Sequence, residues 1–258
     1  MPTVSLGYSP REQFVPFHTR TERWSALVCH RRAGKTVATI ADLIDALLRC
    51  PKDNPRGAYV APTFVQAKDV AWEYAKRFSA AIPGVTFNES ELRIDYPNGA
   101  RLRLYGAENY DRMRGLYLDY LVLDEYADMN PAAWPEVLRP ALADRKGQCV
   151  FIGTPKGRNA FFDICEQAKA SPDWFYDRMR ASETGIVDPD ELEDARATMT
   201  KEQYATEFEC SFDSAVVGSY YGGEIEQAYE ERRVGNVPHD PALPVTTYWD
   251  LGLDDATA

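Results

Sequence analysis

The first part of the chain alternates short apolar runs with segments in which apolar residues recur at helical spacing. Residues 23–29 are mostly apolar and predict a buried strand, and apolar positions spaced three and four apart predict a helix over 36–48. Residues 57–61 and 62–81 repeat this strand and helix pattern. The alternation predicts an α/β domain with a mainly parallel central sheet flanked by helices.

Two alternating runs further on predict a hairpin. Residues 92–96 and 101–105 flank a Pro-Asn-Gly turn at 97–99, and Asn-Gly between alternating runs is a strong hairpin signal. Period two places Arg101 and Arg103 on one face of the second strand. The plain interpretation of this pair is a solvated hairpin face, and the alternative is contact with DNA phosphates.

The next elements complete the α/β pattern. Asn130 can cap a helix that opens with a proline, and we expect this helix to stop near Arg139 because Pro140 follows. A buried strand over 148–152 then leads into a Gly-Thr-Pro turn. A helix over 159–169 closes the unit.

The pattern of alternating strands and helices ends after residue 173, and this change determines the expected domain organisation. Residues 1–173 form the predicted core, and the strand and acidic helices of 174–234 predict a small lid subdomain. Residues 235–244 are rich in turn formers and lack periodicity, as a linker would. The strand-like run in 245–258 ends in acids with almost no chain after it, so we expect it to begin a further domain that is cut off.

The composition narrows the class of protein. With 258 residues, 45% of them hydrophobic, the chain can bury a full core. Its 29 basic and 40 acidic residues give a net charge of −11, so any contact with nucleic acid must be local. We expect no membrane span and no signal peptide, and hence a cytosolic protein. The five scattered cysteines predict reduced thiols, with neither a disulfide framework nor a zinc site.

The segment between the first strand and the first helix carries the clearest chemistry. It ends in Gly-Lys-Thr, the layout of a phosphate-binding loop in which a lysine reaches the β/γ oxygens and a hydroxyl binds Mg²⁺. Lys35 and Thr36 fit these two roles. The usual first glycine of the motif would stand where this chain has Cys29. The residues expected to bind the nucleotide here are Arg32, Ala33, Gly34, Lys35 and Thr36.

A second segment supports this interpretation. Residues 119–123 predict a short apolar strand, and it ends in the adjacent acids Asp124 and Glu125. Next to a phosphate loop, Asp124 can hold the Mg²⁺ shell and Glu125 can polarise the water that attacks the γ-phosphate of ATP. The pair of motifs therefore predicts ATP hydrolysis. The alternative is a protein that only binds nucleotide as an assembly scaffold, and Cys29 is its best support.

In this order the motifs resemble those of the large terminase subunit of tailed bacteriophages, the ATPase that pumps DNA into empty capsids. Members of that family tolerate a phosphate loop without its first glycine and place an arginine four residues before the lysine, which is Arg31 here. A Gly-Thr-Pro motif follows the acid pair, here at 153–155, and Gln13 matches a glutamine that contacts adenine. The resemblance implies a P-loop NTPase fold of the ASCE type.

The resemblance also implies roles for several residues. Arg31 would contact the γ-phosphate and signal its loss, although Arg31 and Arg32 could instead form a solvated basic turn. The hydroxyl of Thr154, at the end of the strand beside the acid pair, would hydrogen-bond Glu125 or the attacking water, although Thr154 could instead be only a strand-to-loop residue. Each site in a ring would be completed by an arginine of the neighbouring subunit. Arg139 is our candidate for this residue, because Pro140 is expected to turn the backbone out of the helix there.

Two loop residues, Arg112 and Arg114, are the rivals of Arg139 for the arginine that acts on a neighbouring subunit.

In the family a nuclease domain similar to ribonuclease H follows the ATPase, and Asp250 matches a metal-binding aspartate on its first strand. Nuclease activity is therefore expected only in a full-length protein. The implied partners are double-stranded DNA, the portal protein, the small terminase subunit and further copies of the chain in a ring, on a procapsid in the host cytoplasm. The alternative function is a helicase-like or remodelling translocase.

Overall fold

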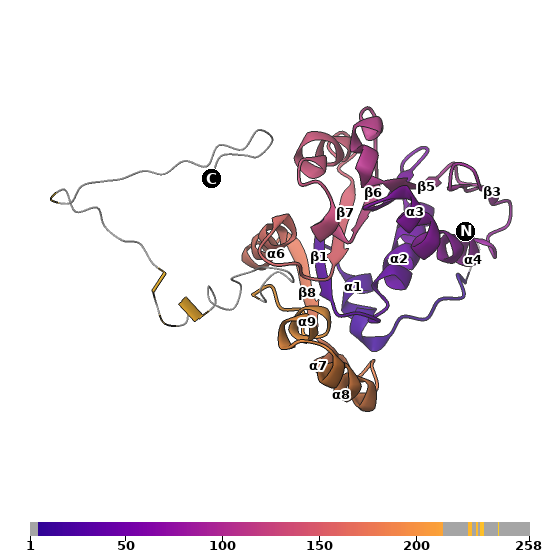
Figure 1. Ribbon diagram of the computed structural model, residues 1–258. Helices are drawn as coiled ribbons and strands as arrows, with labels where there is room; N and C mark the ends of the chain where they lie inside the picture. Colours follow the sequence, from indigo (N-terminus) through magenta and orange to yellow (C-terminus); the bar gives the residue numbers. More distant parts are fainter. Residues whose placement is uncertain (1–4, 214–226, 229–230, 232, 235–241, 243–258) are drawn as a thin grey trace. The chain divides into compact units, whose positions relative to one another are not determined.

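The computed structural model describes residues 5–213, 227–228, 231, 233–234 and 242. These residues contain an eight-stranded sheet with helices on both faces (Figure 1). The strands are β1 (Trp24–Cys29), β2 (Arg56–Ala61), β3 (Thr86–Asn88), β4 (Arg93–Asp95), β5 (Arg101–Gly106), β6 (Tyr120–Asp124), β7 (Gln148–Gly153) and β8 (Trp174–Met179). The described α-helices are α1 (Val15–Thr19), α2 (Lys35–Arg49), α3 (Phe64–Ala67), α4 (Glu73–Ser79), α5 (Arg139–Ala141), α6 (Ala160–Ala170), α7 (Ala181–Thr184), α8 (Pro189–Thr198) and α9 (Lys201–Glu207).

The strand order is β3-β4-β5-β2-β6-β7-β1-β8. β4 pairs antiparallel with both β3 and β5, and the remaining pairs are parallel. The predicted hairpin is confirmed, since Asp95 lies opposite Arg101 and Arg93 opposite Arg103. The parallel strands all end at one edge of the sheet, which we call the carboxyl edge, and begin at the opposite, amino edge. Ligands of open parallel sheets bind at the carboxyl edge.

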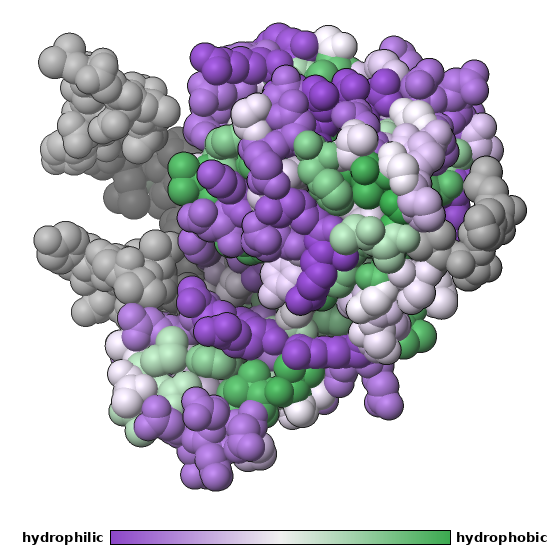
Figure 2. Space-filling model, turned by 90° about the vertical axis from the view of Figure 1, so that its right-hand side faces the viewer, coloured by the Kyte–Doolittle hydropathy of each residue, from purple (hydrophilic) through white to green (hydrophobic). Residues whose placement is uncertain are grey.

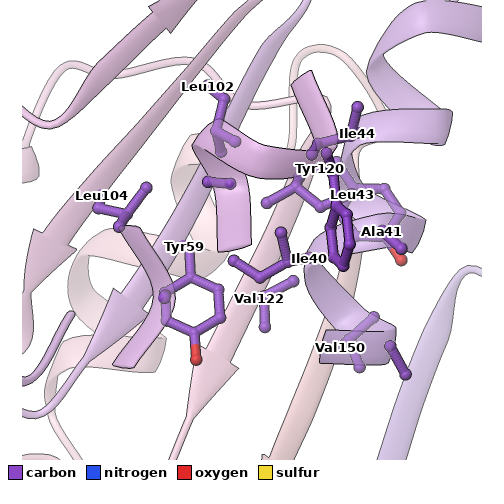
Figure 3. Close-up of a cluster of buried hydrophobic side chains, with 14 of the residues drawn as sticks. Ile40, Ala41, Leu43, Ile44, Tyr59, Leu102, Leu104, Tyr120, Val122 and Val150 are labelled. Carbon is purple, nitrogen blue, oxygen red and sulfur yellow. The ribbon is translucent and has the colours of Figure 1, made fainter. Parts of the chain in front are cut away.

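Two hydrophobic clusters cover the two faces of the sheet. On one face α2 buries Ile40, Leu43 and Ile44 against the strands, and Figure 3 shows these side chains meeting Tyr59 and Val122. On the other face α6 and the segment 133–142 pack over β1, β6 and β7. Each large apolar side chain buried in this way contributes about 1.5–3 kcal/mol. The clusters fix α2, and therefore the loop before it, against the sheet.

The surface is mostly polar. Figure 2 shows a predominantly hydrophilic face on which hydrophobic residues form small separate patches. Large hydrophobic side chains exposed in the described part of the chain include Phe64, Val65 and Val70, which lie on or next to α3. No helix in this part is long and apolar enough to cross a membrane.

Two expectations differ from the structure. The sequence predicts that the helix after the acid pair stops near Arg139, but a π-helical turn (Trp134–Leu138) continues through Pro140 as α5. The N–H of Arg139 bonds to Trp134 O, five residues back, and this wider turn accommodates the following proline, which has no N–H. The sequence also predicts a lid over 174–234, whereas its first segment, β8, pairs along its whole length with β1 in the sheet.

The short helices after β8 agree with the sequence pattern. Asp188 caps α8, since its side chain accepts a hydrogen bond from the N–H of Asp190, and Thr200 caps α9 through a capping box with Gln203. The linker expected at 235–244 and the strand expected at 245–258 lie outside the described residues, apart from residue 242.

Candidate nucleotide-binding site

The phosphate loop joins the buried end of β1 to the start of α2. Cys29 is the last residue of β1, and its side chain is fully buried with Sγ 3.9 Å from Met179 Sδ. Position 29 is thus a strand residue packed in the core, which explains how the loop does without a glycine there. The left-handed conformations fall later, at Arg32 (φ 67°) and Gly34 (φ 100°). A glycine at 34 meets that backbone geometry without strain.

The acid pair lies at the end of β6, on the same edge of the sheet. One strand, β7, separates β6 from β1, which is the strand arrangement of ASCE P-loop proteins. Asp124 is the buried last residue of β6, and Glu125 turns out of the strand in a left-handed conformation (φ 50°). The N–H of Glu125 donates to Asp124 Oδ1 at 3.0 Å. The turn therefore separates the two carboxylates, one buried and one facing the loop.

The two predicted motifs meet directly. Lys35 Nζ lies 2.7 Å from Glu125 Oε1, and the side chain of Lys35 is only 13% exposed. The backbone N–H of Thr154 donates to Glu125 Oε2 at 3.3 Å. Burial alone would lower the pKa of Lys35, but the carboxylates of Glu125 and Asp124 outweigh burial and raise it. The lysine is therefore a cation aimed into the site.

Asp124 has a partner that the sequence pattern did not indicate. The hydroxyl of Tyr59, at the buried centre of β2, donates to Asp124 Oδ2 and also contacts the Thr36 side chain. Burial and the Asp124 carboxylate raise the pKa of Tyr59 well above its usual value, so the phenol is a donor. Burial, with the nearby Glu125 carboxylate, raises the pKa of Asp124 to about 6. Tyr59 thus brings the hydroxyl of Thr36 and the carboxylate of Asp124 to one place.

A pocket of about 780 Å³ opens over Lys35, Thr36 and Glu125. Its lining contains the loop from His30 to Val37 and, across from it, Glu125, Asp128, Thr154 and Lys156. All five loop residues predicted to bind nucleotide are among them. A smaller hollow of about 260 Å³ shares Arg11, Gly34 and Val37 with the larger pocket. Its other lining residues are Gly7, Tyr8, Ser9, Phe14, Arg77 and Phe78.

The loop also contacts the helices that follow β8. Arg31 Nε donates to Glu207 Oε2 at 2.9 Å, and the N–H of Arg31 donates to Glu207 O at 2.9 Å. His30 is fully buried, with Nδ1 2.6 Å from Arg31 O and Nε2 2.9 Å from Thr184 Oγ1. Burial lowers the pKa of His30, so the ring is neutral. Since Nδ1–H faces a carbonyl, Nε2 accepts from the Thr184 hydroxyl.

Two expected site residues lie away from this pocket. Gln13 Nε2 donates to Thr184 O at 2.7 Å, and Gln13 does not line either cavity. The guanidinium of Arg139 lies 4.9 Å from the ring centre of Trp24, the first residue of β1. Because β1 has six residues, its two ends are about 17 Å apart. Arg139 is therefore remote from the phosphate loop of its own chain.

The two arginines expected to contact DNA lie on the second strand of the hairpin. Arg101 Nε donates to Asp95 Oδ1 at 2.6 Å, and the Arg103 guanidinium lies over the ring of Tyr105. Asp250 lies outside the described residues. Within the described part of the chain, no group of three or more His, Cys, Asp or Glu side chains could hold a metal ion.

Comparisons with known proteins agree with this geometry. No protein-family model matches the chain. It is 29% identical over 178 residues to the large terminase subunit of Thermus phage G20c, a match that covers 62% of this chain and 36% of that protein. The large terminase ATPase domain of Thermus phage P74-26 superposes with a TM-score of 0.71 at 22% identity, over 80% of this chain and 95% of that domain.

A third match carries a nucleotide. The large terminase of another thermophilic bacteriophage, solved in complex with ADP, superposes with a TM-score of 0.66 at 13% identity, over 81% of this chain and 54% of that one. The fold and the paired motifs define a P-loop NTPase of the ASCE type. The chain is similar in sequence to phage large terminase subunits and has the fold of their ATPase domains. It spans about a third of the length of the G20c relative.

Proposed function

We propose that this chain is the ATP-hydrolysing motor domain of a phage large terminase. The observation that carries the proposal is the 2.7 Å contact between Lys35 Nζ and Glu125 Oε1, two residues that line the 780 Å³ pocket. It joins a phosphate-binding cation to a carboxylate that can act on water. The thermophilic phage terminase solved with ADP supports a nucleotide as the ligand.

The residues present fit an Mg²⁺ ion that arrives with ATP. Asp124 and Thr36 offer the hard oxygen ligands that this ion prefers, and Tyr59 holds both side chains near one another. The buried Asp124 carboxylate lies beside a second carboxylate, an arrangement that a cation relieves. When bound, the ion would offset negative charge on the β- and γ-phosphates.

The residues of the chain supply the rest of the chemistry. A triphosphate in the loop competes with Glu125 for Lys35, and this frees the Glu125 carboxylate to orient and deprotonate a water molecule. Arg31 lines the pocket and forms an ion pair with Glu207, and it is our candidate for contact with the γ-phosphate. Thr154 N–H fixes the second carboxylate oxygen of Glu125.

We place the nucleotide base in the 260 Å³ hollow beside the loop, where Tyr8 offers an aromatic ring. Gln13, expected to contact adenine, would reach the base only after releasing the Thr184 carbonyl. The helices between residues 181 and 207 are our candidate for the moving lid, because Arg31 and His30 bind them directly.

The wider role is also a proposal. As in the terminases to which it is similar, the domain would act on double-stranded DNA as part of a ring, with a portal protein and a small terminase subunit as partners on a procapsid. Linker 235–244 and the segment from 245 would lead to a nuclease domain, with Asp250 as one metal ligand. Cutting activity would belong to the full-length protein.

Two substitutions test the proposed chemistry. Lys35→Ala should abolish ATP binding measured by calorimetry, because the site loses its phosphate-binding cation. Glu125→Gln should keep ATP binding and lower phosphate release by about 10² to 10⁴. Matched controls are Lys52→Ala, at the amino edge, and Glu136→Gln, in an exposed ion pair with Arg114. Near wild-type turnover in Glu125→Gln would remove this residue from the reaction.

A further inference from the structure

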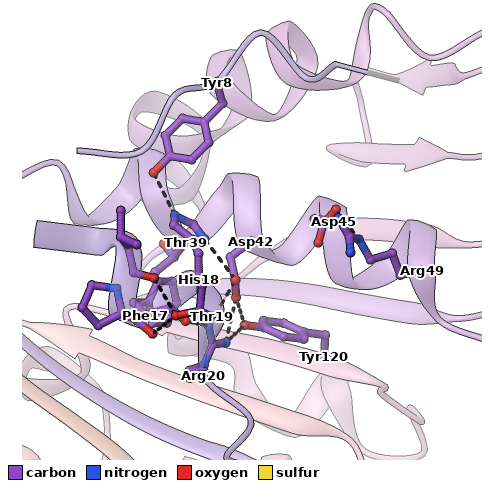
Figure 4. Close-up of polar contacts among 12 residues, drawn as sticks. Tyr8, Phe17, His18, Thr19, Arg20, Thr39, Asp42, Asp45, Arg49 and Tyr120 are labelled. Atoms are coloured by element: carbon purple, nitrogen blue, oxygen red, sulfur yellow. Dashed lines mark hydrogen bonds and ion pairs between the residues drawn. The ribbon is translucent and has the colours of Figure 1, made fainter. Parts of the chain in front are cut away.

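The N-terminal segment is anchored against α2 before it reaches the phosphate loop. The hydroxyl of Tyr8 lies 2.9 Å from His18 Nε2, and His18 Nδ1 lies 3.3 Å from Asp42 Oδ1 on α2 (Figure 4). Arg20 adds a two-point ion pair with the same carboxylate, with Nη2 2.7 Å from Oδ2. Phe14, which follows closely in the chain, is 1% exposed. The segment around Arg11 is therefore held in place on both sides.

From this segment Arg11 reaches the phosphate loop. Its Nη1 donates to Ala33 O at 2.6 Å and to Arg32 O at 3.2 Å. The same guanidinium lies next to Gly34, where an added Cβ would be 3.4 Å from Nη1. Arg11 is also part of the lining of both cavities at the loop. Arg11 lies two residues before Gln13 in the segment matched to adenine contact, and the motifs give it no role of its own. It nevertheless binds two consecutive carbonyls of the loop.

These two bonds constrain how the loop presents its backbone. The C=O and N–H groups of a trans peptide point in opposite directions, and the described chain has no cis peptide bonds. Arg11 therefore directs the N–H groups of Ala33 and Gly34 to the side away from itself. The N–H of Ala33 donates to His30 O at 3.3 Å within the loop, and the N–H of Gly34 is the one that we expect to meet a phosphate. Arg32 adopts a left-handed conformation (φ 67°) that a non-glycine residue holds only at a cost, so an external contact stabilises it.

We propose that Arg11 is a positioning residue for the phosphate-binding loop, which orients the loop N–H groups for a phosphate chain before ligand binds. The proposal rests on the proposed nucleotide-binding function. It differs from a role in contacting the base or ribose, and from a simple contribution of positive charge. Arg11 acts on phosphate through the peptides it holds.

The test measures binding of two probes, ATP and inorganic tripolyphosphate, by calorimetry with Mg²⁺ present. Arg11→Gln should weaken both by about tenfold, the size expected from losing charge-assisted hydrogen bonds that hold the loop. The matched control is Arg77→Gln, which removes a cation from the same hollow, where the Arg77 guanidinium lies over the rings of Tyr74 and Phe78. It should leave tripolyphosphate binding within twofold of the wild type.

A second measurement addresses the loop itself. Amide hydrogen exchange in peptides covering residues 30–36 should be faster in ligand-free Arg11→Gln than in the wild type, while the melting temperature stays within about 2 °C because Arg11 is exposed. Weakened ATP binding with unchanged tripolyphosphate binding would assign Arg11 to the base or ribose and overturn the proposal. Equal loss of tripolyphosphate binding in both variants would reduce its role to charge and also overturn it.

Unchanged binding and exchange in Arg11→Gln would overturn the proposal as well. A wild-type chain that binds neither probe would instead refute the proposed nucleotide-binding function on which it rests. The two failures are therefore distinguishable in one set of titrations.

Discussion

The two edges of the parallel sheet both carry charged residues, but they use them differently. At the amino edge the buried Asp119 is fully paired: Arg145 Nε lies 2.8 Å and Lys52 Nζ 3.2 Å from its Oδ1, and the N–H of Arg56 donates to Oδ2. At the carboxyl edge Lys35 and Glu125 form an ion pair that lines an open pocket, and Asp124 is buried beside a second acid.

The two edges shift the pKa of their buried carboxylates in opposite directions. The cations around Asp119 outweigh its burial and hold its pKa below the usual value, whereas burial raises the pKa of Asp124 to about 6. A paired buried charge stabilises the fold, and a buried charge beside a like charge costs stability unless a ligand offsets it. The amino edge is therefore built for stability and the carboxyl edge for a ligand.

Arg139 tests this difference between the edges most directly. It is an exposed cation at the amino edge, and it is our candidate for an arginine that acts in hydrolysis on a neighbouring subunit. We expect Arg139→Ala to bind ATP normally and to lower hydrolysis by about 10³ to 10⁵, if Arg139 completes the site of a neighbouring subunit. Phosphate release and ATP titration measure the two effects.

Mixing experiments separate action between subunits from action within one. Arg139→Ala combined with Glu125→Gln should recover part of the activity in co-assembled rings, because an intact Glu125 site can meet an intact Arg139. The same mixture with Arg114→Ala tests the rival in the loop before β6. Arg114 is paired with Asp111 and Glu136 in this structure. Without recovery in rings shown to contain both variants, Arg139 would have no role between subunits.

Asp119 tests the stabilising edge. Asp119→Ala should lower the free energy of unfolding by about 2–3 kcal/mol, since Lys52, Arg145 and the Arg56 N–H lose a charged partner. ATP affinity should stay within twofold. Urea unfolding and calorimetry check the two statements, with Asp45→Ala, in an exposed pair with Arg49, as the control. A tenfold loss of ATP affinity in folded Asp119→Ala would break the distinction between the edges.

Local patterns were sufficient to predict the elements and the motif residues. The P-loop and acid-pair segments each combine a strand, a turn and specific side chains within a few residues, so their roles can be predicted without knowing the fold. The boundaries of β1, α2 and β7 agree with prediction to within about one residue, a margin that differing assignments of element ends also show. The same short-range logic gave the hairpin at 97–99.

Contacts between distant segments could not be predicted. Tyr59 lies 65 positions from Asp124 and reads as an ordinary apolar strand residue, since its hydroxyl matters only once β2 and β6 are neighbours. Glu207 and Thr184 reach the loop only through the return of the chain after β8. The place of β8 itself in the sheet depends on strand order, which periodicity does not encode. The change in sequence pattern after residue 173 therefore does not mark the start of the lid.

The pH dependence of the unfolding free energy tests the comparison at Asp124. Because the folded state raises the pKa of this carboxyl to about 6, the folded chain binds more protons than the unfolded chain between about pH 4 and 6. Its contribution to stability therefore falls as pH rises through this window, by on the order of 1–2 kcal/mol without metal or nucleotide. Asp124→Asn should flatten this part of the curve of unfolding free energy against pH. An unchanged slope in this variant would contradict the assignment.

The smallest expected effect concerns the hairpin, a third charged surface that belongs to neither edge. Arg103 lies over Tyr105, whereas Arg101 is paired with Asp95, which Arg93 also contacts. If both arginines contact DNA phosphates, Arg103→Gln should reduce the slope of log affinity against log salt by about one. Arg101→Gln should reduce it by less, because Asp95 already offsets that charge. Fluorescence anisotropy with duplex DNA over a salt series measures the slopes, and Arg49→Gln on α2 should leave the slope unchanged. Identical slopes in all three variants would leave the hairpin as a solvated surface, and DNA contact would have to be sought elsewhere on the domain.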